Sequence, residues 1–260
     1  MSRQATANLQ QCWSSLDNLL SGLDDDQWVT QSLCPDWDIR GVVAHLGGIE
    51  YMFSLDEPGA WSENLPFDKV GEWLSKIADM SNAEHLAAYR SLIATRTEQL
   101  SSLTDEQLAL PTLTPVGPGS YGRFLAVRVF DFWVHEQDMR VPLGLPGHEG
   151  GDAAEMSIDE IQASLGYIVG KKIGMEDGTS ITIELTGPVE RVMHVAVTGR
   201  ATPVDALEDP TVVLRADSTA FALLACGRVD PQDVIDQGRV GWDGDEVWGE
   251  KAARNLAFTM

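Results

Sequence analysis

Apolar side chains recur every three or four residues along much of the first half of the chain, a period that predicts amphipathic helices. Asp38 is a suitable N-cap for one of them, and Ser81 with Glu84 forms a capping box for another. Four long helices and one short helix favour a four-helix bundle. A stretch rich in Pro and Gly, 111–119, is predicted to be a loop. The predicted helices cover about residues 4–23, 39–55, 70–80, 81–103 and 120–143.

The pattern changes after residues 142–147, where Pro and Gly end the last helix and predict a domain boundary. Strands are predicted from alternating apolar positions at 180–185, 192–198, 211–215, 240–242 and 246–248. Helices are predicted at 153–169, 218–226 and 250–258. Strands mixed with helices favour a small α+β domain. We therefore expect two domains, a helical bundle over 1–147 and an α+β domain over 148–260.

The chain of 260 residues has 18 Lys and Arg against 40 Asp and Glu, a formal charge of −22. This acidity argues against nucleic acid and anionic membranes as partners. The three cysteines, Cys12, Cys34 and Cys226, form no C-x-x-C pair, which favours a reducing compartment. The sequence has no signal-peptide pattern and no apolar run of membrane length. We expect a cytoplasmic protein, either a monomer or a homodimer.

The predicted helix over 120–143 carries two polar side chains on a stripe that should enter the core. Asp131 and His135 are four residues apart and share one helix face with apolar side chains. Burying them is costly unless something pairs them, and a divalent metal would do so. His45 lies on the apolar stripe of the predicted helix over 39–55, so a second imidazole also points toward the presumed core.

Two imidazoles and one carboxylate match a catalytic zinc site with a fourth position left for water or substrate. Nickel, iron and manganese are also compatible with these ligands. The alternative is that each His is an ordinary core residue and that Asp131 is only a hydrogen-bond partner. Asp138, three residues after His135, either orients that imidazole or is a solvated residue near the helix end.

The remaining polar residues give weaker signals. His85, His148 and His194 have no acidic partner at ligand spacing, and they are interpreted as surface or structural residues. The three cysteines are interpreted as small apolar side chains. Arg228 follows a predicted helix and either contacts an anionic substrate or complements the helix dipole. No Walker, Rossmann or nucleophile-elbow motif is present.

Three segments carry a resemblance to a known family. Residues 34–46 (CPDWDIRGVVAHL) and 134–140 (VHEQDMR) resemble two signatures of the mycothiol-dependent maleylpyruvate isomerase family. Residues 220–228 (AFALLACGR) and 255–258 (NLAF) are loosely similar to its C-terminal domain. The resemblance implies a two-domain fold, with an N-terminal DinB-like four-helix bundle and a small C-terminal sterol-carrier-like α+β domain.

The resemblance also implies a chemistry. It implies that His45, Asp131 and His135 hold the metal, although the isomerase is expected to have Glu where this chain has Asp131. It implies zinc or another divalent metal that lowers the pKa of the thiol of mycothiol, a low-molecular-weight cosubstrate. The thiol would attack a small-molecule electrophile, in either cis-trans isomerisation or S-transfer. Arg228 would lie near the substrate carboxylates.

Two other functions remain open from the residues alone. The first is a non-catalytic module in which the metal is structural or the second domain binds an apolar ligand. The second is a metal-dependent hydrolase that uses a zinc-bound water and needs no thiol.

Overall fold

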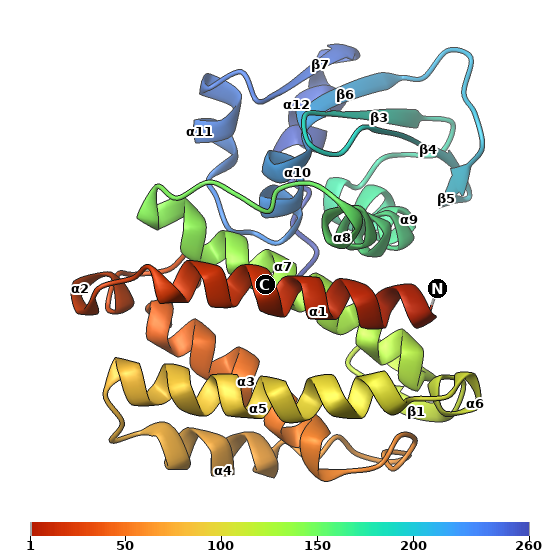
Figure 1. The fold of residues 1–260 in the computed structure, drawn as a ribbon. Coiled ribbons are helices and arrows are strands. Elements are labelled where there is room, and N and C mark those ends of the chain that lie inside the picture. Colours follow the sequence, from red (N-terminus) through yellow and green to blue (C-terminus); the bar gives the residue numbers. More distant parts are fainter. Residues whose placement is uncertain (1, 260) are drawn as a thin grey trace. The chain divides into compact units, whose positions relative to one another are not determined.

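The structure, a computed structural model, describes residues 2–259. The chain divides into two compact units, the first ending at His148 and the second beginning at Glu149. Both units are visible in Figure 1. Within residues 2–259, no helix combines the length and the apolar character that crossing a membrane requires.

The first unit is built on four long helices, as the apolar periodicity predicts. Helix α1 packs along α7, and α3 packs against both α5 and α4 (Figure 1). Two short helices, α2 and α6, lie in stretches for which the sequence pattern predicted no helix. The bounds are α1 (Ser2–Ser21), α2 (Asp25–Trp28), α3 (Ile39–Leu55), α4 (Asp68–Ile77), α5 (Asn82–Ser102), α6 (Asp105–Leu108) and α7 (Tyr121–Leu143).

Side-chain caps fix the points at which the two most important helices begin. The Asp38 carboxylate accepts a 2.7 Å hydrogen bond from the Gly41 amide, which confirms Asp38 as the N-cap of α3. Ser120 caps α7 in the same way, accepting from the Arg123 amide at 3.1 Å. At the other end of α7, Gly144 adopts a left-handed conformation with φ 64°. Glycine suits this position because a side chain would be strained there.

Two consecutive glycines in the middle of α3 permit close packing of α4. A Cβ atom on Gly47 would lie 2.8 Å from Nε1 of Trp73. A Cβ atom on Gly48 would lie 2.8 Å from Cγ1 of Val70. The helix-propensity cost of these glycines is therefore offset by contact between the two helices.

The predicted loop over 111–119 is instead a short antiparallel hairpin. Strand β1 (Pro111–Thr114) pairs with β2 (Gly117–Ser120). The hairpin is fixed to the preceding segment, because the Leu113 amide donates to the Trp61 carbonyl at 2.7 Å. Its Pro and Gly content masked the strand signal, and the contact with Trp61 is too distant in sequence to be read from a local pattern.

The second unit is a small mixed α+β structure, as predicted. Its sheet has the strand order β5-β4-β3-β6-β7, in which β3 and β6 are parallel and the other neighbours are antiparallel. The strands are β3 (Ser180–Thr186), β4 (Arg191–Thr198), β5 (Arg200–Val204), β6 (Val212–Asp217) and β7 (Val240–Gly244). The helices are α8 (Asp152–Ala163), α9 (Leu165–Tyr167), a π-helical segment (Ile168–Ile173), α10 (Ser218–Ala225), α11 (Pro231–Asp236) and α12 (Glu246–Arg254).

The predicted strand at 246–248 is wrong, because this stretch is the first turn of α12. The Asp245 carboxylate accepts from the Trp248 amide at 3.0 Å and so starts a helix. Gly244 has φ 92°, and a Cβ atom there would lie 2.5 Å from the Thr211 carbonyl oxygen. The turn after β7 therefore leads into a helix rather than back into a hairpin.

His85 illustrates a buried histidine with a structural role. Its side chain has no solvent exposure and lies against Trp28 and Trp73, with ring centroids 5.9 and 6.4 Å away. Neither ring nitrogen has a hydrogen-bond partner among the described residues. Burial, together with the nearby charge of Arg40, lowers the pKa of His85 to about 4. The imidazole is therefore neutral at pH 7.

This burial predicts a pH-dependent loss of stability that can be assigned to one residue. Because the folded-state pKa of His85 lies below its unfolded value, the stability is complete above about pH 6.5 and falls as the pH drops toward 4. At pH 5 we expect a loss of about 2 kcal/mol in unfolding free energy from His85 alone. His85→Met, which keeps a similar volume, should remove this part of the loss. Urea unfolding of both proteins at pH 7 and pH 5 measures it, and equal losses would contradict the assignment.

Candidate metal centre

Helices α3 and α7 bring the three predicted ligands together. His45 lies on α3, and Asp131 and His135 lie one turn apart on α7. One ligand atom from each residue lies within 4.8 Å of the others. The His45 Nε2 atom is 3.5 Å from one carboxylate oxygen of Asp131, and the His135 Nε2 atom is 3.5 Å from the other.

These separations suit a shared metal ion better than direct hydrogen bonds. Two ligand atoms held about 2.1 Å from a tetrahedral ion lie about 3.4 Å apart, whereas a hydrogen bond brings N and O to about 2.9 Å. In addition, the Nε2 atom of His45 is buried and has no hydrogen-bond partner among the described residues. A buried ring nitrogen that faces a carboxylate and a second imidazole without a hydrogen bond is a feature that a bound cation would explain.

The opposite edge of the His135 ring is held by two further groups. The Nδ1 atom lies 2.8 Å from the Asp138 carboxylate, and the thiol of Cys34 donates to the same carboxylate oxygen at 3.1 Å. Asp138 is completely buried, so it orients His135 and is not a solvated residue near the helix end. The interpretation of Cys34 as a mere apolar side chain is wrong, since its thiol contacts both of these groups.

Cys34, His135 and Asp138 form a second group of potential ligands whose donor atoms are mutually close. The 2.8 Å distance between His135 Nδ1 and Asp138 is that of a hydrogen bond and leaves no room for an ion between them. The geometry therefore favours a metal at Nε2 of His135, while the bond from Nδ1 to Asp138 orients the ring.

Trp37 forms an aromatic wall beside the two imidazoles. Its ring stacks on His45 with centroids 4.8 Å apart and an interplanar angle of 25°, and its centroid is 5.9 Å from that of His135. The loop that carries Trp37 is joined to α7, because the Leu33 amide donates to the Asp138 carbonyl at 3.0 Å. The same segment therefore shields one side of the candidate centre and supplies Cys34.

The candidate centre is partly open to solvent. The side chains of His45 and Asp131 are 25% and 26% exposed, whereas that of His135 is 8% exposed. An enclosed structural metal would have all of its ligands buried. Among the described residues the cluster offers three protein ligands, one fewer than a closed structural site.

The charges around the three residues favour a bound cation. Burial alone would raise the pKa of Asp131, but the Arg128 guanidinium and the imidazoles of His45 and His135 outweigh it and lower the pKa. Burial would lower the pKa of His135, but its bonds to Asp138 and Cys34 and the charge of Asp131 raise this pKa to about 10. The site thus holds an ionised carboxylate and an imidazole that attracts positive charge, either a proton or a metal.

His148 differs from the sequence interpretation, which found no acidic partner for it. Its Nδ1 atom lies 2.7 Å from the carboxylate of Glu136, which also accepts from Arg140 at 2.7 Å and from Ser15 at 2.6 Å. Glu136 and His148 are twelve residues apart, so no helical spacing reveals the pair. This group joins α1 to α7 and contains none of the three predicted ligands.

Arg228 lies in the second unit, just after α10 and the turn that follows it. Its guanidinium donates to the Cys226 carbonyl at 3.1 Å, and its own amide donates to the Leu223 carbonyl at 2.8 Å. These bonds hold the residue at the end of α10, which fits its predicted position after a helix. Its contact with a substrate stays a prediction.

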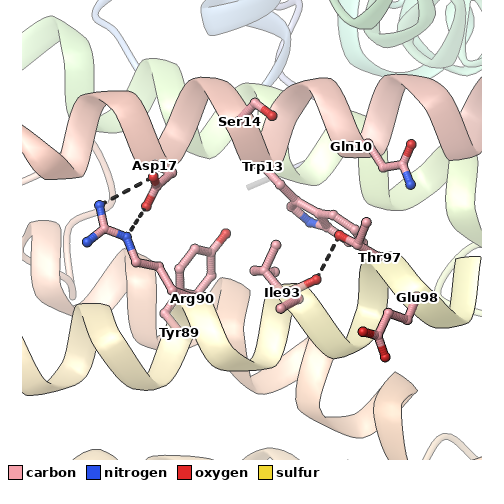
Figure 2. A pocket seen from close by; sticks show the side chains of 10 residues that line it. Gln10, Trp13, Ser14, Asp17, Tyr89, Arg90, Ile93, Thr97 and Glu98 are labelled. Carbon is pink, nitrogen blue, oxygen red and sulfur yellow. Dashed lines mark hydrogen bonds and ion pairs between the residues drawn. The ribbon is translucent and has the colours of Figure 1, made fainter.

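A separate hollow of about 650 Å³ lies between α1 and α5 in the first unit. Figure 2 shows Trp13 and Tyr89 between the two helices, with the ion pair of Arg90 and Asp17 at one end. The Trp13 Nε1 and Tyr89 hydroxyl atoms are buried and have no partner among the described residues. Since both atoms are closed to solvent and none of the three predicted ligands lines the hollow, it offers no comparable chemistry.

The fold and this centre define a class of protein, namely a helical bundle with a candidate divalent-metal site joined to a small α+β unit. The family model for the mycothiol maleylpyruvate isomerase N-terminal domain matches residues 9–140, and the model for the C-terminal domain of the same proteins matches residues 155–254. The chain belongs to the mycothiol maleylpyruvate isomerase family.

Comparison with solved structures gives the same fold. A crystal structure of the mycothiol-dependent maleylpyruvate isomerase matches with a TM-score of 0.61 and 15% identity, covering 94% of this chain and 93% of the other. A single-substitution variant of that isomerase matches with a TM-score of 0.63 and 14% identity, with the same coverage. No curated protein sequence matches the chain.

The role of Asp138 can be tested by an isosteric change. Asp138→Asn should weaken the orientation of His135, and metal affinity should fall about 10–100-fold. Glu136→Gln is the matched control, because Glu136 is also a buried acid on α7 but pairs with His148. Competition with a chromophoric chelator measures both affinities. An Asp138→Asn protein that binds metal as tightly as the Glu136→Gln protein would contradict the orienting role.

Proposed function

We propose that this protein is a metal-dependent enzyme that activates the thiol of mycothiol and adds it to a small electrophilic substrate. Two facts support the proposal: the chain belongs to the mycothiol maleylpyruvate isomerase family, and His45, Asp131 and His135 converge at distances suited to one ion. The second fact is the stronger support, because the three residues that the family resemblance implies as ligands lie together in this chain.

The residues of the centre have distinct roles in this proposal. His45, Asp131 and His135 would hold the ion, and two nitrogens with one oxygen suit zinc, although other divalent metals are compatible. When bound, such an ion lowers the pKa of a thiol and supplies thiolate at neutral pH. Asp138 fixes the His135 ring, and Trp37 covers one side of the imidazoles.

The substrate determines the overall reaction. If the sulfur adds to a cis double bond, rotation about the resulting single bond and loss of the thiol give the trans isomer. The thiol is then recovered unchanged, so the reaction is an isomerisation. If the adduct is released with the sulfur attached, the reaction is an S-transfer. Both reactions use the same thiol activation and differ only in the fate of the adduct.

The partial exposure of the centre favours catalysis over a purely structural metal. The side chains of His45 and Asp131 are 25% and 26% exposed, whereas a structural centre is normally closed by four protein ligands. A hydrolase would use the same open position for water. That alternative predicts turnover without any thiol, so omission of the thiol distinguishes the two reactions.

The principal test is removal of single ligands. His45→Ala and Asp131→Ala should each lose most of the bound metal, because two ligands hold a divalent ion far less tightly than three. Thiol-dependent turnover of a model electrophile should fall by about 100-fold or more in both variants. His194→Ala, in the second unit, is the control and should retain metal and turnover. Elemental analysis and an assay with and without mycothiol provide the measurements.

The outcomes of this test separate the alternatives. Full metal occupancy in both variants would contradict the three-residue centre. Metal loss with turnover that never depends on the thiol would favour the hydrolase. Metal loss without any turnover under either condition would favour a non-catalytic module.

Arg228 is proposed to bind the carboxylate of an anionic substrate. Arg228→Ala should then raise KM about tenfold or more for a carboxylated electrophile and change KM little for a neutral one, since a charged hydrogen bond contributes about 1.5–3 kcal/mol. Arg254→Ala provides the comparison, because Arg254 pairs with Glu250 on the surface of the same unit. Equal kinetics of the Arg228→Ala and wild-type proteins with the carboxylated substrate would remove this role.

A further inference from the structure

A chain of buried charges leads through the helical bundle to one of the candidate ligands. Glu50, on α3, has no solvent exposure and accepts from the guanidinium groups of Arg96 at 2.9 Å and Arg128 at 3.1 Å. Arg128 also donates to the carboxylate of Asp131. The four charged side chains therefore alternate in sign from α5, through α3, to the candidate metal centre on α7.

Arg128 contacts both helices that carry the three candidate ligands. Its Nε atom donates to Glu50, and its Nη2 atom donates to the Leu46 carbonyl at 3.3 Å. Both acceptors belong to α3, and Leu46 directly follows His45 in the chain. Its Nη1 atom donates to Asp131, one turn further along α7. The donors of a guanidinium lie in one rigid plane, so these bonds fix the two helices relative to each other.

Ring contacts also join the two helices. Helices α3 and α7 approach closely over a short stretch, whereas α1 packs along much of α7. Phe53 packs against Phe124 with centroids 4.7 Å apart, two turns from His45, and the rings of His45 and His135 lie edge to face with centroids 4.9 Å apart. The polar contacts of Arg128 lie at the same height along the two helices as the three candidate ligands.

We propose that Arg128 is a positioning residue that sets the metal-binding geometry of His45 and Asp131. It holds the Oδ2 atom of Asp131, so the Oδ1 atom faces the Nε2 atom of His135 at 3.5 Å. Through Leu46 it also fixes the backbone beside His45. This inference rests on the proposed metal centre. It makes a residue outside the three ligands responsible for how those ligands are placed relative to one another.

The bundle provides a matched control for this role. Arg96 is as buried as Arg128, at 1% against 3% exposure, and pairs with the same carboxylate of Glu50. However, the hydrogen bonds of Arg96 to Glu50 and Gln99 reach neither a candidate ligand nor the turn that carries His45. A purely structural role for Arg128 predicts that the two arginines behave alike in metal binding. A positioning role predicts that they differ.

The test compares Arg128→Met with Arg96→Met. Both should unfold at lower urea concentration in the presence of a chelator, because each leaves Glu50 with one partner instead of two. Zinc affinity, measured by chelator competition on the folded proteins, should fall about 10–100-fold in Arg128→Met and change less than about threefold in Arg96→Met. Cobalt substituted for zinc should give a changed visible absorption spectrum in Arg128→Met only.

A second variant covers the case in which Arg128→Met does not fold. Arg128→Lys keeps a positive charge for Glu50 but lacks the planar fork that reaches three acceptors. It should lose zinc affinity and alter the cobalt spectrum in the same direction. If the arginine variants and the wild type bind zinc equally, the positioning role is overturned while the metal centre stands. If the wild-type protein itself binds no metal, the proposed function fails first, and this inference fails with it.

Discussion

The structure of the first unit depends on how it neutralises a carboxylate that water cannot reach. Glu50 lies inside a helical core, where an unpaired charge would cost several kcal/mol. Two guanidinium groups from α5 and α7 balance it, and the planar side chain of Arg128 extends to Asp131. The bonds that offset the cost of burying Glu50 therefore also place Arg128 against Asp131, at the edge of the candidate metal centre.

The need to balance buried carboxylates also applies around the ring of His135. Its ring lies between two carboxylates, Asp131 at the Nε2 edge and Asp138 at the Nδ1 edge. Arg128 balances Asp131, and the thiol of Cys34 only donates a weak hydrogen bond to Asp138. Arg96 and Arg128 together offset Glu50 and Asp131, so one negative charge remains, which a proton on His135 or a bound cation would neutralise. The ligand spacing, rather than the charge, favours a metal ion as the occupant.

Local sequence patterns predicted the parts of this arrangement that depend on helical spacing. Asp131 and His135 were identifiable because a polar pair interrupts an apolar stripe at i and i+4. His45 was identifiable in the same way, and the caps at Asp38 and Ser81 placed their helices correctly. The helical bundle followed from the number and length of the stripes.

The remaining contacts could not be predicted because they join distant residues. Cys34 and Asp138 are separated by 104 residues, and Glu50 and Arg128 by 78. Nothing in the local sequence distinguishes a buried Glu with two arginine partners from an exposed Glu on the outer face of a helix. The hairpin at β1 and β2 and the helical start of α12 were missed for a related reason, since contacts to Trp61 and Thr211 determine their conformations.

Asp131 shows how helix packing determines which ligand a site accepts. The isomerase itself is expected to have a glutamate at this position, and aspartate is shorter by one methylene. The short side chain still lies 3.5 Å from both imidazoles, so α3 and α7 must be close enough at this level to compensate. Arg128 provides that proximity by binding the α3 backbone and Asp131 with one guanidinium. The type of carboxylate and the buried arginine are therefore best understood together, because the shorter side chain approaches both imidazoles only where the two helices are held close.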